Sequence, residues 1–398
     1  MLKNICRCKK TAFFLFLLLF SKYLVAQEQY KFSNEIEEGI NNDKSGNDSY
    51  KYQMGAMNYS ISNYYLKGLE TWDKLGRRVN KLSKEDSLKF TKLKVENAKD
   101  YILNRSKNEE LIILNEAHHY SSHRIFATSL LKGLYENGYR YIGIETLDDD
   151  SINIRKFPTT DSGFYSSEPQ FGNFIKIALD LGFTLFKYES MPGKSGKERE
   201  IEQAENIFNF MQKNNEGKYL IYCGYDHAYE GKHRSWDKTM AGRLSDLTKI
   251  NPFTIDQTQF SEKSSPELSE SVISIVNKNY PVVLIDDRQI AFNGNQKELF
   301  TDIKVINPIT KYIKGRPNWM LNKNRKFYQV PKSKIENYPC LILAYRKGEL
   351  ERNGVPADVI ELKSIKDTRY LVLDIGKYDI ILKNKLYQII SRFEKTIK

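Results

Sequence analysis

Cysteine is scarce in this chain, which excludes a scaffold built on disulfides. Four cysteines occur in 398 residues, and two of them, Cys6 and Cys8, precede an apolar run near the N-terminus. The remaining pair, Cys223 and Cys340, is too little for a disulfide framework, and Cys223 falls in a strand-like run. We expect both to be buried thiols.

Motifs for several common chemistries are also missing. The sequence has no Gly-x-Ser-x-Gly turn, which argues against classical serine hydrolase chemistry. The segment Gly193-Lys194-Ser195-Gly196 lacks the earlier glycine that a phosphate-binding loop requires, so we interpret it as a flexible surface loop. No heptad, low-complexity tract or repeat of about 20–50 residues indicates a coiled coil or a solenoid.

An apolar run long enough to cross a membrane is not found near the N-terminus. Residues 11–20 are apolar, basic residues precede them, and Leu24-Val25-Ala26 follows. Such a run is shorter than the roughly 20 residues that span a bilayer, and its setting is typical of a cleaved secretory signal. We therefore predict a signal peptide over residues 1–26 and an exported protein, periplasmic or secreted, without a stable membrane span. The alternative is a single membrane anchor.

The charge of the chain does not indicate nucleic-acid binding. Its 62 basic and 50 acidic residues give a formal charge of +12, and residues 1–26 carry five bases and no acid, which leaves 57 bases against 50 acids and a charge of +7. The excess is spread among many acids and forms no basic stripe, as expected of a solvated surface. With 40% hydrophobic residues, the chain can bury one large core with smaller additions.

The pattern of apolar residues predicts an α/β protein. Residues 27–107 read as an N-terminal helical segment with two long amphipathic stretches, 49–75 and 83–103. Residues 108–325 alternate short apolar runs with helical ones, which is typical of a mostly parallel sheet flanked by helices. The expected strands are 111–114, 141–144, 183–188, 219–223, 253–256 and 282–285, and the expected helices are 124–136, 171–181, 197–213 and 236–249. Residues 326–398 form a small β-rich appendage, with a hairpin near Gly376-Lys377-Tyr378.

All five histidines fall in two windows, 115–123 and 223–233, each directly after an expected strand. Ligands of open parallel sheets bind beyond the carboxyl ends of the strands, where Glu145 and Glu189 also lie. His118, His227 and Glu145 would suit a divalent metal such as zinc, manganese or iron with an open position for water, or metal-free acid–base hydrolysis.

The other two histidines of the first window leave two alternatives open. His119 and His123 lie four residues apart, a spacing used by metal ligands if the segment is helical. In the first turn of a helix beside Arg124, the same pair would serve only as a cap or face solvent.

The paired motifs resemble a known superfamily. Asn115-Glu116-Ala117-His118, a strand ending in Glu145, and Gly224-Tyr225-Asp226-His227 are similar to the motifs of the erythromycin esterase, ChaN and TraB/TIKI superfamily, whose members share two Gly-x-x-His-like motifs and an intervening strand-end glutamate. The segment around Arg199 resembles the Arg-containing helix before the second motif. The resemblance covers about residues 108–260.

The superfamily includes metal-dependent peptidases, a macrolide-ring esterase and a haem-binding lipoprotein. The resemblance implies a centre of Glu116, His118, Glu145 and His227, with Arg199 contacting a substrate anion. Two departures stand out. Asn115 replaces the usual glycine but tolerates a left-handed backbone, and Asp226 stands where a small residue is common, so that it would orient an imidazole or add a ligand.

The sequence thus predicts an exported hydrolase of the ester or amide class, acting on a small molecule or a peptide. His118, His227 and Glu145 are the expected metal ligands, Glu116 or Glu145 is the expected general base with a raised pKa, and Arg124 and Arg199 are the expected substrate contacts. The alternatives are a haem- or ligand-binding protein of the ChaN type, using these histidines with Tyr120, Tyr225 or Tyr229, and an inactive scaffold. We expect Asp286-Asp287 and Arg316-Pro317-Asn318-Trp319 to be structural rather than catalytic, although an Arg beside a Trp also suits a carboxylate or a ring.

Overall fold

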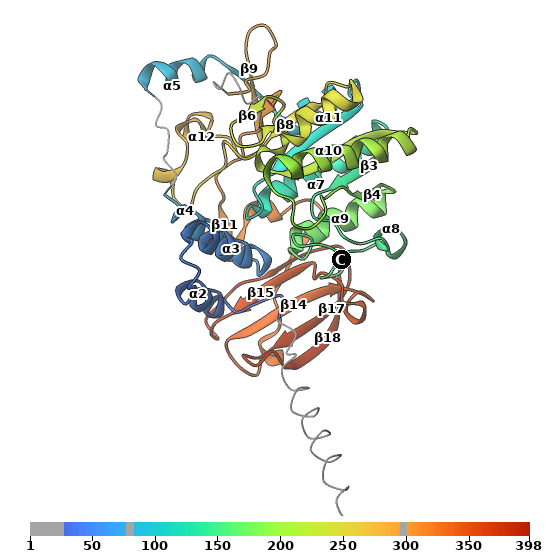
Figure 1. Cartoon of the computed structure of the whole chain (residues 1–398). Coiled ribbons are helices and arrows are strands. Elements are labelled where there is room, and N and C mark those ends of the chain that lie inside the picture. Colours follow the sequence, from blue (N-terminus) through green and yellow to red (C-terminus); the bar gives the residue numbers. More distant parts are fainter. Residues whose placement is uncertain (1–27, 77–82, 295–300) are drawn as a thin grey trace, which may run out of the picture.

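A computed structural model describes residues 28–76, 83–294 and 301–398, so the predicted signal peptide lies outside the described residues. The main sheet has six parallel strands in the order β10-β8-β2-β5-β3-β4 (Figure 1). These strands are β2 (Leu111–Glu116), β3 (Tyr139–Ile144), β4 (Thr184–Lys187), β5 (Lys218–Gly224), β8 (Phe253–Asp256) and β10 (Ile303–Lys304). The predicted α/β class with a parallel sheet is confirmed.

Helices cover both faces of this sheet. One face packs on α6 (Ala98–Arg105), α7 (Ser121–Glu136) and α9 (Pro169–Leu181), and the other on α10 (Gly196–Lys213) and α11 (Met240–Thr248). The side chains of β2 show why both faces are apolar: Ile112 and Leu114 point into the first core, whereas Leu111 and Ile113 point into the second. Alternation along a doubly covered strand gives the continuous hydrophobic run seen in the sequence.

The N-terminal region is helical, as predicted, but less continuous. It contains α2 (Ser33–Asn41), α3 (Asp48–Ile61), α4 (Tyr65–Asp73) and α5 (Lys84–Thr91). The stretch 49–75 is broken at Asn63, whose backbone is left-handed with a φ of 65°.

The prediction of one helix over 83–103 is wrong in its middle. Residues Lys94–Asn97 form β1, which pairs antiparallel with β9 (Val282–Ile285) in a two-stranded sheet. Asn97 then caps α6 by accepting hydrogen bonds from Lys99 N and Asp100 N, a local bond that ends the extended segment. The same pairing corrects the expectation that 282–285 belongs to the parallel sheet.

The connections contain short elements. They are α8 (Ile152–Arg155), η1 (Tyr225–Ala228), β6 (Lys232–His233), β7 (Asp237–Lys238), η2 (Pro266–Leu268), α12 (Ser271–Val276), β11 (Tyr312–Ile313), β12 (Arg316–Pro317), η3 (Asn318–Met320), η4 (Lys332–Lys334) and η5 (Leu350–Arg352). None of the helices in the described ranges is both long and apolar enough to cross a membrane.

The C-terminal region is rich in β-strands, as expected. An antiparallel sheet of β14 (Cys340–Arg346), β15 (Asp358–Leu362), β17 (Gly376–Lys383) and β18 (Ile389–Ile397) has the order β15-β14-β17-β18, and β13 (Arg325–Tyr328) pairs with β16 (Leu371–Asp374). The turn at Gly376 therefore links two different sheets, and the hairpin is formed by β17 and β18.

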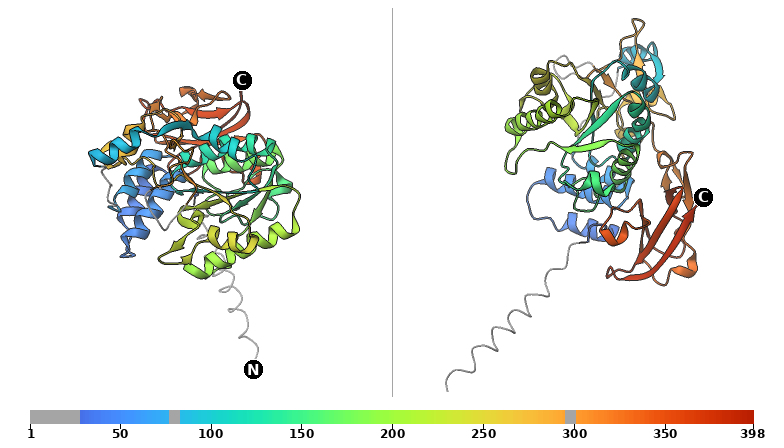
Figure 2. Two further views of the ribbon diagram at one scale, coloured as in Figure 1. Left: turned by 90° about the horizontal axis from the view of Figure 1, so that it is seen from above. Right: turned by 90° about the vertical axis from the view of Figure 1, so that its right-hand side faces the viewer.

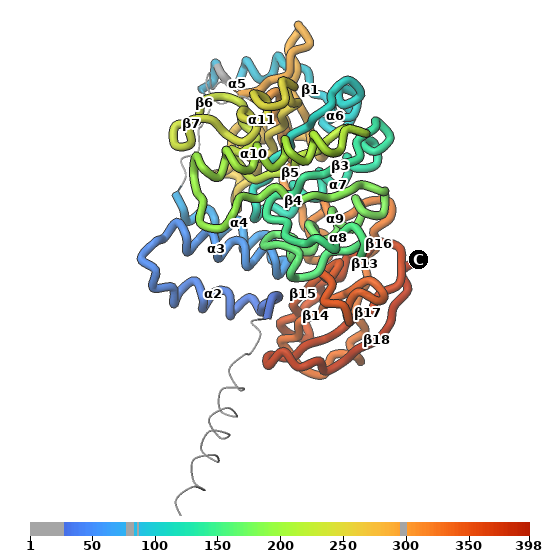
Figure 3. The backbone as a smooth tube through the Cα atoms, turned by 45° about the vertical axis from the view of Figure 1, so that its right-hand side comes forward, coloured from blue at the N-terminus to red at the C-terminus, as the bar shows by residue number. Residues whose placement is uncertain are grey.

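The C-terminal sheet packs against the N-terminal helices (Figures 2 and 3). Its Leu341 and Leu343 share a core with Phe32, Met57 and Ile61 from the other end of the chain. Both cysteines outside the N-terminal segment are free and buried, as predicted, Cys223 in β5 and Cys340 in β14.

Candidate active site

The strand order brings the two histidine windows together. Because β5 lies between β2 and β3, the carboxyl ends of these three strands are direct neighbours. Glu116 at the end of β2 is in register with Gly224 at the end of β5, and Glu145 N, just after β3, donates to Tyr222 O at 3.1 Å. The predicted residues after all three strands therefore meet at one edge of the sheet.

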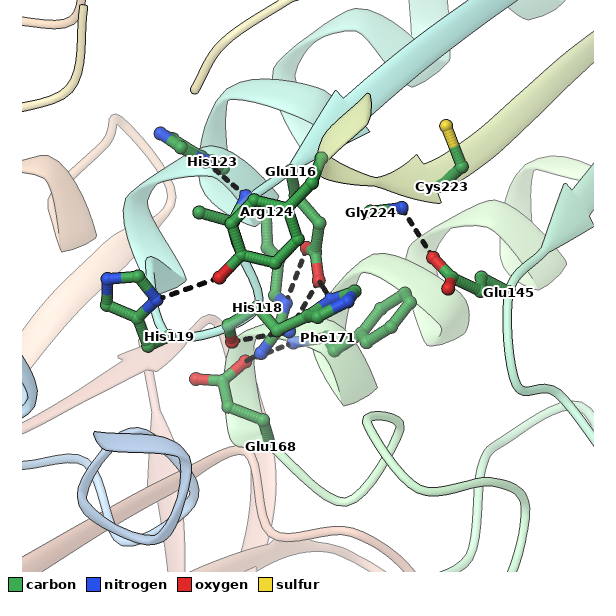
Figure 4. Close-up of polar contacts among 12 residues, drawn as sticks. Glu116, His118, His119, His123, Arg124, Glu145, Glu168, Phe171, Cys223 and Gly224 are labelled. Atoms are coloured by element: carbon green, nitrogen blue, oxygen red, sulfur yellow. Dashed lines mark hydrogen bonds and ion pairs between the residues drawn. The ribbon is translucent and has the colours of Figure 1, made fainter. Parts of the chain in front are cut away.

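His118 is held in a fixed orientation after β2 (Figure 4). Its ring stacks on Tyr165, with centroids 3.7 Å apart, and meets Tyr225 edge-on at 5.1 Å. Nδ1 lies 3.0 Å from Oε1 of Glu116. An ionised carboxylate only accepts, so this contact places the proton on Nδ1 and leaves Nε2 as a lone-pair acceptor.

Glu116 is buried and charged. Its carboxylate accepts from Nε and Nη2 of Arg124 at 2.8 and 2.6 Å and from the hydroxyl of Tyr222 at 2.8 Å. Burial raises the pKa of Glu116, but the charge of Arg124 and the hydrogen bonds from His118 and Arg124 outweigh burial and lower it to about 2. The carboxylate is therefore ionised throughout the neutral range, contrary to the raised pKa expected from the sequence.

Arg124 forms the ion pair that holds the carboxylate of Glu116 in place. Its side chain is fully buried, its Nη1 lies 2.9 Å from Oε2 of Glu168, and its Nη2 donates to the carbonyl oxygen of His118 at 2.9 Å. Burial lowers the pKa of Arg124, yet the charges of Glu116 and Glu168 raise it above its usual value. A substrate does not reach a guanidinium buried in this way, so the expectation that Arg124 contacts the substrate does not fit the structure.

Gly224 marks the point where the two windows touch. A β-carbon at this position would lie 2.4 Å from Nε2 of His118 and 3.0 Å from Oε2 of Glu145, closer than real contacts permit. The backbone N–H of Gly224 donates to Oε2 of Glu145. Glycine is therefore required here by the close approach of two side chains rather than by a left-handed backbone.

Arg199 joins the carboxylates on the other side of Glu145. From α10, its Nη2 lies 2.7 Å from both Glu145 Oε1 and Glu189 Oε2, and its Nε donates to Glu189 Oε1 at 2.9 Å. Burial raises the pKa of Glu145, but the charges of His227, His118 and Arg199 hold it below its usual value. The pKa of Glu189 is likewise lowered, because the hydrogen bond and charge of Arg199 exceed the effect of burial. Glu145 is ionised and fully engaged.

His227 closes the network. Its Nε2 lies 2.9 Å from Nη1 of Arg199, and its Nδ1 lies 2.7 Å from Oε1 of Glu200. Burial lowers the pKa of His227, whereas the charges of Glu145 and Glu200 raise it, and the net direction is upward. In the neutral ring, Nε2 accepts from Nη1 of Arg199 and the proton lies on Nδ1, which faces Glu200.

The predicted metal centre of His118, His227 and Glu145 stays a prediction, and in this arrangement its members are bound to other side chains. Nε2 of His227 and Oε1 of Glu145 lie 3.6 Å apart, and the guanidinium of Arg199 donates to both and so uses lone pairs that a metal would need. In the part of the chain that the structure describes, no group of three or more His, Cys, Asp or Glu side chains is placed to hold a metal ion. The cation at the centre of the site is an arginine.

The remaining histidines of the two windows have other roles. His119 precedes α7, which begins at Ser121, so His119 and His123 do not share a helical face as one alternative required. His123 accepts from Ala117 N at 3.1 Å, and burial lowers its pKa to about 3. It is a neutral, structural histidine. His233 lies 3.3 Å from Asp226.

The two departures from the superfamily pattern have structural explanations. Asn115 donates to Tyr225 O at 2.8 Å and to Asp256 Oδ1 at 2.9 Å, and it accepts from Gln257 N at 2.8 Å. Its side chain thus ties β2 to the end of β8 and to the second histidine window. Asp226 contacts the imidazole of His233 rather than that of His227.

Several residues of the network were not predicted. They are Tyr165, Glu168, Glu200 and Tyr222, and Glu189 was noted only as a strand-end residue. Glu200 is buried with Gln203 on one side of α10, and its place directly after the predicted Arg199 is the sequence signal that could have found it. Asp286 lies elsewhere, after β9, and binds Arg288 at 2.9 Å, in agreement with a structural role.

An open hollow adjoins the network. It has a volume of about 960 Å³ and is lined by residues that follow β3 and β4, among them Thr146, Phe164, Lys187, Glu189 and Met191. Since Thr146 follows Glu145 and Glu189 binds Arg199, this hollow opens beside the paired carboxylates.

Comparison with known proteins identifies no family. No family model and no curated protein matches the chain. Solved structures with a partial likeness include the type III effector HopBA1 (9% identity, 54% of this chain and 96% of that chain, TM-score 0.36) and RRSP, a MARTX toxin effector domain from Vibrio vulnificus (14% identity, 60% and 47%, TM-score 0.30). At these TM-scores the likenesses carry no weight for fold or function.

Proposed function

We propose that this chain is an exported hydrolase of the ester or amide class in which His118 activates water without a metal. One observation carries the proposal: Glu116 holds Nδ1 of the His118 ring, which leaves the basic Nε2 beside Gly224 as the acceptor. A carboxylate that fixes the tautomer of a histidine base is a recurrent device of hydrolytic sites. The side chain of His118 is 13% exposed, enough to meet a water molecule.

The general base in this proposal is His118 rather than a glutamate. Glu116 and Glu145 both have lowered pKa values and fully engaged oxygens, so neither accepts a proton readily near neutral pH. In the first step, Nε2 of His118 takes a proton from water, whose oxygen bonds to the substrate carbonyl carbon. In the second, the imidazolium returns that proton to the leaving alcohol or amine as the carbon–oxygen or carbon–nitrogen bond breaks.

Arg199 is the proposed contact for the developing oxyanion. A guanidinium has five N–H groups, and four of those of Arg199 are directed at Glu145, Glu189 and His227. The second N–H of Nη1 has no partner among the described residues, and the side chain is 25% exposed. This single remaining donor, on a cation already fixed by its neighbours, suits an oxygen whose charge grows in the transition state.

The hollow beside Glu189 is the proposed substrate site. Its size lies within the range of about 300–1,000 Å³ typical of small-molecule sites. Phe164, Met191 and Phe210 supply an apolar lining, whereas Lys187 and Asp148 lie among its polar residues. We therefore expect a substrate with an apolar group next to the scissile carbonyl, either a small ester or a peptide.

The test is a hydrolysis assay on the chain from Gln27 onward, with nitrophenyl esters of increasing acyl length and a mixture of unstructured peptides. His118→Gln should reduce kcat/KM by about 100-fold or more, because a general base contributes at least that much. His233→Gln is the matched control, since His233 lies at the same edge but contacts Asp226, and it should retain parental rates. A chelator should leave the rates unchanged.

Two outcomes would count against the proposal. Parental rates in His118→Gln would exclude His118 as the base, and loss of rate on chelation would restore the predicted zinc, manganese or iron centre. If the parent hydrolyses nothing and gains a Soret band on addition of haem, the alternative of a haem-binding protein takes its place.

A further inference from the structure

A second hollow lies apart from the candidate active site and is lined by residues of α4, of the β11–β12 hairpin and of the loop that precedes β16. Its volume is about 510 Å³. The lining residues that bear on its chemistry are Tyr64, Lys67, Tyr312, Arg316, Lys363 and Arg369. No step of the proposed hydrolysis uses them.

The lining carries an excess of positive charge. Arg316 is neutralised by Asp358, to which its Nη2 donates, but Lys363 and Arg369 have no ion pair among the described residues. Lys67 has only a long contact of 3.9 Å with Glu37. Since Glu70 is the single acidic residue among the described residues of the lining, the hollow presents more cations than anions.

Arg316 adds a second, independent feature. Its side chain is 3% exposed, and its Nε has no hydrogen-bond acceptor within the described ranges. Burial lowers the pKa of Arg316, and the nearby charge of Arg369 lowers it further, which Asp358 only partly opposes. Asp358 is the only carboxylate paired with Arg316 among the described residues, and Asp367 accepts from the backbone N–H groups of Lys363 and Arg369 without an ion pair to either side chain.

The position of Arg369 is fixed by the hairpin turn. Gly315 in that turn has a φ of 71°, and a β-carbon there would lie 2.9 Å from Cγ of Arg369. The turn therefore packs against the stem of the arginine, whose side chain is half-buried. A restrained guanidinium loses less conformational freedom on binding than an exposed lysine, and its planar fork matches a carboxylate or a phosphate.

We propose that this hollow binds a small organic anion, a carboxylate or a phosphate carried on a single ring. The anionic group pairs with Arg369 and Lys363, and the ring packs beside Tyr312, which is 46% exposed at the mouth. The volume lies within the usual range for small ligands, about 300–1,000 Å³.

The wall nearest the candidate active site is Tyr65. Its ring faces Trp319, with centroids 5.0 Å apart, and its hydroxyl lies 3.2 Å from Ser122 Oγ in the first turn of α7. Tyr65 thus separates this hollow from the loop that carries His118. Binding of the anion uses no reacting group of the hydrolysis proposed above, so the two proposals can be tested separately.

Calorimetric titration at low salt tests the proposal, with phenyl phosphate, benzoate and inorganic phosphate as probes and phenol as the neutral control. We expect phenyl phosphate or benzoate to bind and phenol not to bind. Arg369→Gln should weaken binding about tenfold or more through the loss of a charge-assisted hydrogen bond, and Lys363→Gln should weaken it less. Lys366→Gln, an exposed neighbour outside the lining, is the matched control.

The three probes distinguish the sources of the anion. Preference for phenyl phosphate with measurable binding of inorganic phosphate identifies a phosphoryl ligand, and preference for benzoate identifies a carboxylate. Failure of all three to bind the parent at millimolar concentration overturns the proposal, as does equal binding by Arg369→Gln and the parent. His118→Gln should bind like the parent, which separates failure of this proposal from failure of the proposed hydrolase.

Discussion

At the scale of single residues, Gly224 is the position where the least change should have the largest effect. Gly224→Ala places a β-carbon 2.4 Å from Nε2 of His118, so the imidazole must move from its position. We expect kcat/KM to fall about 100-fold, as for loss of the base itself. Gly39→Ala is the control, because a β-carbon on Gly39 in α2 meets nothing within 4 Å. Parental hydrolysis by Gly224→Ala would show that His118 does not work from this position.

The buried His123 should make the free energy of unfolding depend on pH. Its pKa is lowered from 6.5 to about 3 by burial, so below pH 6.5 the unfolded chain binds a proton that the folded chain does not. The folded state therefore has its full stability above pH 6.5 and loses it as the pH falls toward 3, by up to about 1.4 kcal/mol per pH unit. Urea unfolding between pH 6.5 and 5 should show this slope in the parent and a flatter one in His123→Gln.

Between pH 6.5 and 5 the change in stability comes mainly from His123. Glu116 titrates at lower pH, because its pKa is about 2 in the folded chain and 4.5 in the unfolded chain. His227 acts in the opposite direction, because its raised pKa stabilises the folded chain below pH 6.5, but it is common to both proteins. Equal slopes in the parent and the variant would show that His123 is charged in the folded chain.

At the scale of elements, α4 supports the loop that carries His118. Trp72 of α4 stacks on His119 at 3.8 Å and lies parallel to Tyr225 at 5.9 Å, and Tyr225 meets the ring of His118 edge-on. A helix that precedes the sheet by 38 residues in sequence, from Asp73 to Leu111, thus helps to set the position of the proposed base.

Removal of the Trp72 ring should therefore reduce turnover more than substrate affinity. We expect Trp72→Leu to lower kcat about tenfold or more, since small displacements of a catalytic group cost this much or greater factors. Trp72→Phe keeps an aromatic stack and should recover much of the rate, provided that both variants have parental circular dichroism. An unchanged kcat in Trp72→Leu would show that the stack only stabilises the fold.

Some elements of the fold follow from the local sequence pattern, and others depend on distant partners. The strand expected at 111–114 is β2, and the helix expected at 197–213 is α10, because runs of apolar residues with period 2 or 3.6 carry their own signal. β1 was missed inside a helix-like stretch, since its conformation depends on pairing with β9. The order in which the strands pair also cannot be predicted from the local pattern of apolar residues.

The same distinction applies to the site. The histidine windows and Glu145 were predicted because strand ends can be located from the sequence. The partners of Arg124 and the ring beside His118 were not, because Glu168 and Tyr165 lie in a loop more than 40 residues further along the chain. The pKa directions of the two glutamates were also missed, because they depend on which cationic groups the fold brings to each carboxylate: Arg124 to Glu116, and His227, His118 and Arg199 to Glu145.

At the scale of the whole molecule, both ends of the chain hold the loop that bears Tyr165 and Glu168. Tyr30 donates through its hydroxyl to Ser167 O at 2.9 Å, and Gln29 donates to Ser167 Oγ at 3.0 Å. Tyr165 itself packs against the core shared by the N-terminal helices and the C-terminal sheet. The C-terminal region thus supports the site although it contributes no reacting group to the proposed mechanism.

A chain that ends at residue 325 should therefore fail to fold around the site. Truncation would expose Phe32, Met57 and Ile61, which pack on Leu341 and Leu343, and an apolar patch of that kind promotes aggregation. In the full chain we expect one cooperative thermal transition. Tryptophan fluorescence, which reports on Trp72, Trp236 and Trp319, should give the same midpoint as far-ultraviolet circular dichroism, which also reports on the C-terminal strands. Two separate transitions, or a folded and active chain of residues 28–325, would show that the parallel-sheet region forms its site without the C-terminal sheet.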